Sequence, residues 1–363
     1  MELKKLSIAN YRNISEADLQ FSPKLNCFVG HNGVGKTNLL DAIYYLSFCR
    51  SAMVQTNGQV IRHNEEWMSL SADYEDDNGQ PLSIRCTLKM GRRKSFKKNG
   101  KEYKKQSEHI GLIPVVMVSP QESELILGGG DVRRRFMDMV ISLYAPEYLQ
   151  QLIRYNQALQ QRNALLKAEG EPDESLLTAY DEMLSLSGQV IYEYRKAFVD
   201  KLAPIFKEVY QQLGGEGEEV SLSYRSHLSE GDLMPILRDY RQKDRIMGYT
   251  LKGVHRDDME MQLGGYALRY EGSQGQSKTY LIALKFAQYQ LLGQHKSLLL
   301  LDDIFDKLDA TRVEKIVRMV SGTDYGQIFI TSTSSETLHR VVDEIGGDYR
   351  FFQVEDGHYM LMN

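Results

Sequence analysis

The segment Gly30 to Thr37, which reads Gly-His-Asn-Gly-Val-Gly-Lys-Thr, constrains the chain most, because it matches the G-x-x-x-x-G-K-[ST] pattern of a phosphate-binding loop. Glycines in this order let backbone N–H groups converge on phosphate oxygens. Lys36 is placed to reach the β- and γ-phosphates, and the Thr37 hydroxyl to bind Mg²⁺. Residues 25–29 predict a buried strand, and residues 36–48 predict a helix whose N-terminus faces the phosphates. The pattern predicts a nucleoside triphosphate site and leaves the reaction open.

Composition excludes several classes of protein. The chain has 363 residues, enough for roughly two domains. No apolar run reaches the length of a membrane span, and the segment from Met1 to Leu6 lacks the apolar core of a signal peptide. Cys27, Cys49 and Cys86 are scattered, without metal-like pairing, as expected of reduced cysteines. The net charge is −5, so any contact with nucleic acid must come from a local patch. We expect a cytoplasmic protein without a membrane partner.

The order of predicted elements indicates an α/β fold with a mixed sheet and an inserted helical arm. Residues 1–145 and 249–363 carry the strands and the nucleotide motifs, and residues 146–248 form the arm. Two long helices, 146–167 and 175–213, are expected to pair as an antiparallel hairpin, with Pro204 kinking the second. Apolar residues recur at seven-residue intervals along this second helix, at Leu177, Leu184, Ile191, Phe198 and Ile205.

Shorter elements follow the arm helices. Ser229 is expected to cap a helix that ends near Arg245, and residues 249–251 to form a short strand. Residues 259–263 and 266–270 predict a hairpin, and a helix is expected from about residue 278. Earlier in the chain, Arg133, Arg134 and Arg135 open a helix, where their charge opposes the dipole. They are expected to face an anion or to pair with acidic residues.

Residues 91–105 form a concentrated basic segment in an acidic chain. Asn99-Gly100 is a strong signal for a two-residue hairpin turn. The candidate DNA contacts are Arg92, Arg93, Lys94, Lys97, Lys98, Lys101 and Lys104, with Lys105 also in the run. Phosphate contacts require only charge, so DNA binding is one interpretation. A solvated edge that blocks aggregation is the other.

A second motif completes the nucleotide chemistry. Four leucines, 298–301, predict a strand buried in a parallel sheet, and Asp302 at its carboxyl end is the Walker B residue expected to hold Mg²⁺. Asp303 follows directly. Because magnesium does not need a second acid there, Asp303 is the candidate to orient or deprotonate the attacking water.

Ser273-Gln274-Gly275-Gln276 is similar to the S-x-G-Q signature of ABC-type ATPases. It precedes a predicted helix and lies 25 residues before the leucine strand. A helix N-terminus binds anions, and in ABC-type ATPases this motif faces the γ-phosphate held by a second protomer.

Over its whole length the chain resembles the RecF family of recombination mediators, which is related to the SMC head ATPases. The motifs that carry the resemblance lie at residues 10–13, 30–37, 133–138, 162–167, 253–258, 273–276 and 301–305. The resemblance implies an ABC/SMC-type ATPase head that dimerises on ATP and binds single-stranded or gapped DNA. It also implies slow, DNA-stimulated hydrolysis of Mg²⁺-bound ATP, and a role in recombinational repair, replication and the SOS response. The implied partners are RecR, RecO and the recombinase.

The resemblance assigns nucleotide contacts beyond the two motifs. The candidate nucleotide-binding residues are Arg12, Asn13, Gly30, His31, Asn32, Gly33, Val34, Gly35, Lys36, Thr37, Asn38, Ser273, Gly275 and Gln276; Lys36 and Asp303 are the catalytic candidates, and Thr37 and Asp302 the metal ligands. The chain departs from the pattern twice. Lys307 stands where an acid is usual, and Ser332-Thr333 stand where many ABC ATPases have a histidine. Sensing of the γ-phosphate there is expected through a hydroxyl or not at all.

Three other functions share parts of this pattern. A transporter ATPase also has both Walker motifs and S-x-G-Q, but would carry a short docking segment where this chain has a basic hairpin and an arm. A P-loop kinase should lack S-x-G-Q. A long-armed SMC protein would need an arm long enough to form a rod.

Overall fold

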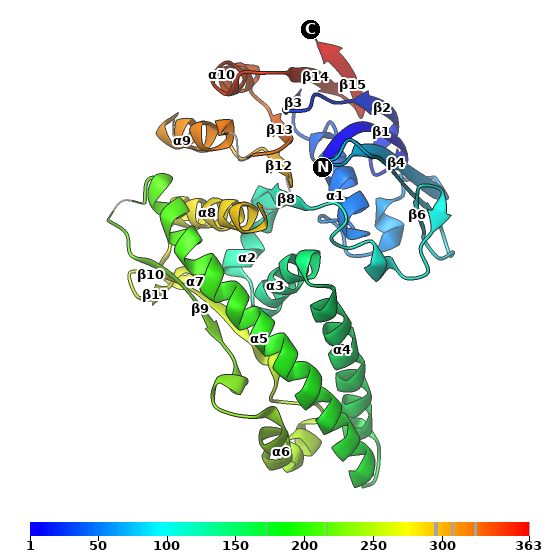
Figure 1. Cartoon of the computed structure of the whole chain (residues 1–363), viewed down its shortest axis with the longest axis vertical. Helices are drawn as coiled ribbons and strands as arrows, with labels where there is room; N and C mark the ends of the chain where they lie inside the picture. Colours follow the sequence, from blue (N-terminus) through cyan, green and yellow to red (C-terminus); the bar gives the residue numbers. More distant parts are fainter. Residues whose placement is uncertain are drawn as a thin grey trace. The chain divides into compact units, whose positions relative to one another are not determined.

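The computed structural model describes residues 1–171, 173–215, 217–293, 297–305, 308, 310–322 and 325–362. Lys307, one of the two departures noted above, lies outside them. The chain divides into two compact units (Figure 1). The first contains Met1–Glu122, Val209–Gly215 and Lys278–Asn363, and the second contains Ser123–Glu208 and Glu216–Ser277. The expected arm boundaries, 146 and 248, therefore fall inside the second unit. The second unit extends beyond both expected boundaries of the arm. Helix α3 (Gly130–Tyr144), which precedes residue 146, and strand β10 (Asp258–Leu263), which follows residue 248, contact each other and belong to this unit.

The first unit contains a six-stranded sheet with the order β15-β14-β3-β13-β12-β8. The strands are β3 (Leu25–Val29), β8 (Val115–Val118), β12 (Leu298–Asp302), β13 (Ile328–Ser332), β14 (Tyr349–Glu355) and β15 (His358–Met362). Neighbouring strands are parallel except in the β14–β15 hairpin. Every residue of β3, β8, β12 and β13 is buried, which explains why their sequences are mainly apolar.

A second sheet of the first unit is antiparallel, with the order β2-β1-β4-β5-β6-β7. Its strands are β1 (Glu2–Tyr11), β2 (Ile14–Gln20), β4 (Trp67–Glu75), β5 (Pro81–Lys89), β6 (Ser95–Lys98) and β7 (Lys101–Glu102). Helix α1 (Lys36–Phe48) contacts strands of both sheets, and nearly all of its residues are buried. This position explains why apolar residues dominate α1 after its first turn. Helix α10 (Ser335–Ile345) contacts β3 and β13, and packs on α9 (Ala310–Ser321).

Short helices connect these strands. They are η1 (Asn57–Val60), η2 (Gln106–Glu108) and η3 (Pro120–Ser123). The structure thus confirms the mixed sheet and the hairpin turn at Asn99-Gly100, where Lys98 pairs with Lys101. It also confirms that the three cysteines are free and buried.

The second unit is mainly helical and contains the predicted helical pair. Helix α4 (Pro146–Lys167) and helix α5 (Glu174–Gln212) run antiparallel. Glu147, near the start of α4, contacts Tyr194 in the middle of α5, whereas Arg162, near the end of α4, contacts Asp181 near the start of α5. Pro204 lies inside α5. The remaining elements are α2 (Glu124–Leu127), β9 (Val220–Arg225), η4 (His227–Ser229), α6 (Leu233–Met247), η5 (Val254–Arg256), β11 (Tyr266–Ala267), α7 (Leu268–Glu271) and the start of α8 (Gln274–Leu292). Strands β11, β10 and β9 form a three-stranded antiparallel sheet.

Several predicted boundaries in this unit are wrong. Residues 249–251 form no strand, because Asn163 and Asp244 accept the backbone N–H groups of Thr250 and Leu251. Helix α6 starts after Asp232, not after Ser229, which belongs to η4. The strand expected over 266–270 ends at Ala267, where α7 begins. Helix α8 begins at Gln274, directly after Ser273 rather than near residue 278.

Candidate functional site: a phosphate loop facing paired aspartates

The phosphate loop joins β3 to α1, and its backbone carbonyls hold the side chain of Lys36 in place. Lys36 Nζ donates to the carbonyls of Gly30 at 2.9 Å and His31 at 3.1 Å, and its side chain is 3% exposed. Gly35 precedes the helix at φ 118°, and a Cβ there would lie 3.1 Å from Asn13 Oδ1. Only glycine combines this left-handed backbone with so close a neighbour. The ammonium group is thus buried among carbonyls that a phosphate can replace.

Asp302 is surrounded by hydroxyl groups. Its Oδ1 accepts from Thr37 Oγ1 at 2.8 Å and from Thr331 Oγ1 at 2.9 Å, and its Oδ2 accepts from Ser119 Oγ at 3.0 Å. Thr37 lies on α1. The other three residues lie at the carboxyl ends of neighbouring parallel strands: Asp302 ends β12, Ser119 directly follows β8, and Thr331 is the penultimate residue of β13. The set of carboxylate and hydroxyl oxygens suits Mg²⁺, which prefers hard oxygen ligands. Among the described residues no cluster of three or more His, Cys, Asp or Glu could hold a metal ion.

Asp303 lies beside the lysine of the phosphate loop. Its Oδ2 is 3.7 Å from Lys36 Nζ, and its backbone N–H donates to Thr331 Oγ1 at 2.9 Å. Its φ is 44°, in the left-handed region that non-glycine residues seldom adopt. Such backbone strain concentrates at functional sites. The conformation turns a second carboxylate toward the phosphate loop.

These residues line a cleft of about 470 Å³ in the first unit. The predicted residues that line it are Arg12, Asn13, Asn32, Gly33, Gly35, Lys36, Thr37, Asn38, Asp302 and Asp303. Met53, Pro120 and Gln121 also line it, and sequence reasoning missed them. Gln121 follows β8, and Asp302 ends the neighbouring parallel strand β12. Both residues therefore lie at the carboxyl edge of the sheet, and this shared position could have identified Gln121 from the sequence. Gly30, His31 and Val34 are not among the lining residues.

A second hollow of about 710 Å³ adjoins the cleft, and the two share Arg12, Asn13 and Asn38. The shared residues are tied to the phosphate loop. Asn38 Nδ2 donates to Asn13 Oδ1 at 2.7 Å, and Asn13 Nδ2 donates to Gly33 O at 3.2 Å. A ligand with phosphates in the cleft can therefore extend into this hollow, which residues 54–65 line on its other side.

The expected γ-phosphate sensors contact other groups. Ser332 Oγ accepts from Ser334 N at 3.0 Å, at the start of α10, and neither Ser332 nor Thr333 lines the cleft. The preceding residue, Thr331, instead contacts both Asp302 and Asp303.

The signature residues belong to the second unit and form a capping box at the start of α8. Gln276 N donates to Ser273 Oγ at 3.2 Å, and Ser273 N donates to Gln276 Oε1 at 2.9 Å. The Gln276 amide also donates to Glu218 at 2.7 Å. Ser273 and Gly275 are exposed. A 19-residue helix therefore presents its positive end close to an exposed serine.

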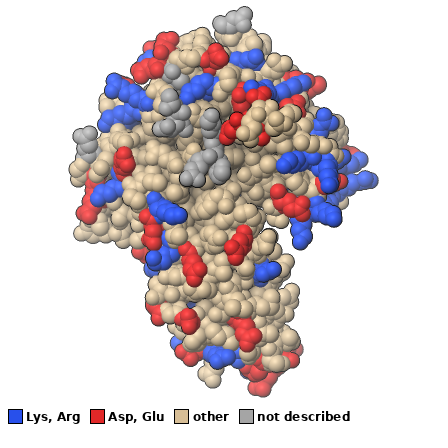
Figure 2. All heavy atoms as spheres, in the orientation of Figure 1, with Lys and Arg blue, Asp and Glu red and all other residues tan. Residues whose placement is uncertain are grey.

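The basic hairpin is only partly exposed. Arg92, Arg93, Lys97, Lys101 and Lys104 are exposed, and Lys98 is half-buried. Figure 2 shows basic side chains gathered at the right-hand edge, where Figure 1 places β6. Lys94 differs from its neighbours, because its ammonium donates to Cys49 O and lies 5.0 Å from the Tyr45 ring centroid. Burial lowers its pKa. Lys94 thus points into the protein, and Phe96 is buried below the hairpin.

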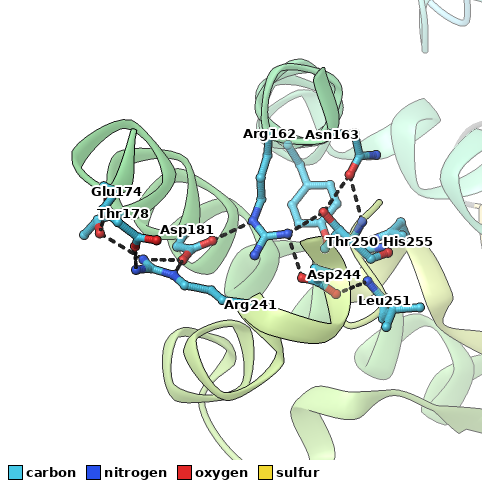
Figure 3. A network of polar contacts seen from close by, with 11 residues as sticks. Arg162, Asn163, Glu174, Thr178, Asp181, Arg241, Asp244, Thr250, Leu251 and His255 are labelled. Atoms are coloured by element: carbon cyan, nitrogen blue, oxygen red, sulfur yellow. Dashed lines mark hydrogen bonds and ion pairs between the residues drawn. The ribbon is translucent and has the colours of Figure 1, made fainter. Parts of the chain in front are cut away.

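Other motif residues of the second unit hold structure together. Arg133 forms a bidentate pair with Asp258 at 2.7 and 2.8 Å, and Arg135 pairs with Asp131 at 2.9 Å, so acidic residues satisfy these two arginines. Arg162 is completely buried and bridges Asp181 and Asp244 at 2.7 Å each (Figure 3). The network shown there joins α4, α5 and α6. It positions the arm rather than a reacting group.

Comparison with known proteins decides the family. Residues 2–357 match the RecF/RecN/SMC N terminal domain. The DNA replication and repair protein RecF of Phocaeicola vulgatus is 54% identical over 98% of this chain and 97% of that protein. The one of Parabacteroides distasonis is 51% identical over the full length of both. The chain belongs to the RecF family.

Solved structures agree with this assignment. A RecF–ATP complex, described as the recombination mediator of the RecFOR pathway, has a TM-score of 0.89 and 29% identity over 100% of this chain and 98% of that one. An SMC head bound to the C-winged helix domain of ScpA has a TM-score of 0.61 at 15% identity, a likeness in fold alone. The chain thus has the ABC/SMC-type head fold predicted from its motifs, and its family is one of ATPases. The transporter alternative is not supported. No described helix is long and apolar enough to cross a membrane.

Proposed function

We propose that the chain binds ATP with Mg²⁺ in the cleft of the first unit and hydrolyses it. The Lys36 ammonium and the N–H groups of the loop would hold the phosphates, while the nucleoside would extend into the adjoining hollow. The ATP-bound state of the solved RecF relative supports this nucleotide. The observation that carries the proposal is the convergence of Lys36, Thr37, Asp302 and Asp303 in one cleft.

The residues have distinct roles in this proposal. Thr37 and Asp302 would hold Mg²⁺, which would neutralise charge that develops on the phosphates. Asp303, to which this proposal gives no metal contact, would orient and deprotonate the attacking water. Gln121, whose side-chain amide both donates and accepts, would help to position that water. Lys36 would move from the Gly30 and His31 carbonyls to the phosphates.

We further propose that ATP joins two copies of the chain. The Ser273 hydroxyl accepts a bond from Gln276 N and can still donate its own proton to a phosphate oxygen. With Gly275 and Gln276 at a helix N-terminus, it would contact the γ-phosphate held by a second copy. A two-fold dimer would then bury two ATP molecules.

The proposed biological role is recombinational repair and replication of DNA, including the SOS response. The relatives' names, DNA replication and repair protein, and the RecFOR title of the solved relative support it. The exposed side chains of the basic hairpin would contact DNA phosphates, and RecR, RecO and the recombinase would be partners. We propose that the helical arm of residues 146–248 is an insertion in the ATPase.

A single set of measurements tests the core of this function. Purified protein is assayed for ATP turnover alone, with single-stranded DNA and with gapped duplex, and its DNA binding is compared with and without ATP. We expect slow turnover that DNA increases, and DNA binding that ATP strengthens. Turnover without any response to DNA, together with ATP-independent DNA binding, would contradict the proposal.

A further inference from the structure

A third hollow, of about 210 Å³, lies within the second unit and has no part in the nucleotide site. Residues of α3, α4, α5 and η5 line it. Its volume is below the roughly 300–1,000 Å³ of pockets that enclose whole small-molecule ligands. It has room for one side chain of another molecule.

The floor of this hollow is fixed by Arg195, which is 2% exposed. Its guanidinium donates to Asp138 at 2.8 Å, to Asp257 at 2.9 Å and to the Val254 carbonyl at 2.7 Å. Arg195 also contacts the Tyr148 hydroxyl at 3.1 Å. With two carboxylates and a carbonyl, this arginine has its charge balanced and serves as structure.

The wall opposite contains a neutral histidine. His255 Nε2 faces the Thr250 carbonyl at 2.9 Å and must carry the proton, so Nδ1 accepts from the Tyr155 hydroxyl at 2.8 Å. Burial lowers the pKa of His255 to about 4. Gly253, at φ 130°, permits this packing, because a Cβ there would lie 2.5 Å from the Tyr155 hydroxyl. His255 therefore adds no charge to the hollow near neutral pH.

Arg134 is the exception among the charged groups of the hollow. It is half-buried, and its Nη1 donates to the backbone carbonyl of Asp257 at 2.6 Å. Arg133 and Arg135 each have a carboxylate partner, whereas Arg134 forms no ion pair with any described residue. Burial, and next the charge of Arg195, lower the pKa of Arg134, while the charges of Asp258, Asp131 and Asp257 raise it. A partly desolvated guanidinium without a directly paired carboxylate is costly, and an added anion in contact with it would stabilise it.

The residues that line the hollow indicate which kind of anion fits beside Arg134. Asp131 and Asp138 lie at the same hollow, so a chain of phosphates would meet two carboxylates beside the guanidinium of Arg134. Leu152 and Val254 supply apolar surface for a methylene stem. We propose that this hollow binds the carboxylate of a glutamate or aspartate side chain on a partner protein, with Arg134 as its ion-pair partner. The charge of the hollow and its size both match one acidic residue on an exposed segment.

The test uses the full chain and a defined probe. The peptide acetyl-Ala-Glu-Ala-amide is titrated into the protein, and the arginine side-chain signals are followed by NMR. We expect saturable shifts of Arg134 signals with the glutamate peptide and none with the glutamine version. Arg134→Gln should weaken binding at least about tenfold, the range for loss of one hydrogen bond to a charged group.

Two further variants separate binding from folding. Asn156→Phe should close the hollow from α4 and weaken binding equally, although all the arginines remain. Arg154→Gln removes the same charge from an exposed position on α4 outside the hollow and should leave peptide binding unchanged. The proposal would be overturned if the glutamate peptide bound the wild type, Arg134→Gln and Asn156→Phe with equal affinity. It would also be overturned if a 12-nucleotide single strand or inorganic phosphate displaced the glutamate peptide, because the hollow would then be a phosphate site.

Discussion

Thr37 Oγ1 donates a 2.8 Å hydrogen bond to Asp302 Oδ1, although 265 residues separate the two in the chain. The bond joins the phosphate loop to the end of β12, so the two proposed protein ligands of Mg²⁺ are in place before the ion arrives. Binding would exchange this hydrogen bond for two metal contacts, direct or through water. Thr331 and Ser119 also donate to Asp302 and keep its carboxylate oriented during that exchange.

Lys36→Ala is expected to abolish measurable ATP binding, because the loop then loses its charge-assisted hydrogen bonds to the β- and γ-phosphates. Each hydrogen bond to a charged group contributes about 1.5–3 kcal/mol, so loss of the contacts to two phosphates should lower the affinity roughly 10²–10⁴-fold. Equilibrium titration with a fluorescent ATP analogue measures the change. Lys201→Ala, at an exposed position on α5, is the control. An affinity for Lys36→Ala equal to that of the control would refute the assignment of the loop.

Asp303→Asn is expected to retain ATP binding and lose turnover, because the amide cannot accept a proton from water. A general base contributes about 10²–10⁴-fold to the rate. Steady-state release of phosphate and a parallel ATP titration give the two quantities, and Asp343→Asn, exposed on α10, is the control. If Asp303→Asn turns over ATP at the normal rate, the second aspartate is structural.

The strands of the nucleotide site could be predicted because buried parallel strands are mainly apolar. Residues 115–118 and 298–301 are wholly apolar runs and residues 25–29 are interrupted only by Asn26, and the loop and Walker B aspartate had to meet at the carboxyl ends of these strands. The hydroxyl partners Ser119 and Thr331 were not identified, since one serine or threonine after a strand is common and only the strand order brings them to Asp302.

Contacts between distant side chains and the backbone limited prediction elsewhere. The segment 249–251 has strand-like residues, but Asn163 and Asp244 take its N–H groups. Lys94 belongs to a run of basic residues, yet its contacts with the Cys49 carbonyl and the Tyr45 ring place it inside. Asn163 lies 87 residues from Thr250, and Cys49 lies 45 residues from Lys94, so no local pattern marks these partners.

Replacing Lys97, Lys98, Lys101 and Lys104 together by glutamine should weaken DNA binding and flatten its dependence on salt. Each phosphate contact that is lost removes released counterions, which changes the logarithmic slope by about 0.7–0.9. The control replaces the arm residues Lys196, Lys201, Lys207 and Lys243, which changes the net charge equally. Binding isotherms at several salt concentrations give the slopes. Equal slopes in the two variants would make the hairpin a solvated edge.

Acid is expected to destabilise the second unit through His255. Its pKa is lowered to about 4 by burial, while the unfolded chain has the ordinary value of about 6.5. Between these values the unfolded state binds more protons, so stability is complete above pH 6.5 and falls as the pH drops toward 4. The loss between pH 7.5 and 5.5 should be about 1 kcal/mol. Denaturant unfolding at both pH values measures it. The His255→Gln variant should lose less unfolding free energy between these pH values, because it lacks the histidine that titrates. The His63→Gln variant, altered at an exposed position, should lose as much as the wild type.

Ser273→Arg is expected to leave ATP binding intact and to block dimerisation and turnover together. The lining residues of the cleft do not include Ser273, so the nucleotide site of the same chain is untouched. The proposed contact is with the γ-phosphate of a second copy, where an arginine would fill the space needed by the phosphate and disrupt the capping box of α8.

ATP should shift the wild type from monomer to dimer because the γ-phosphate makes contacts present only in the closed state, and ADP should not. Sedimentation velocity in ATP, in ADP and without nucleotide measures the shift. Ser334→Arg, which alters a serine cap on α10 in the first unit, is the matched control and should still dimerise. A wild type that stays monomeric at micromolar concentration in all three conditions would exclude the mechanism, as would a Ser273→Arg variant that dimerises with ATP.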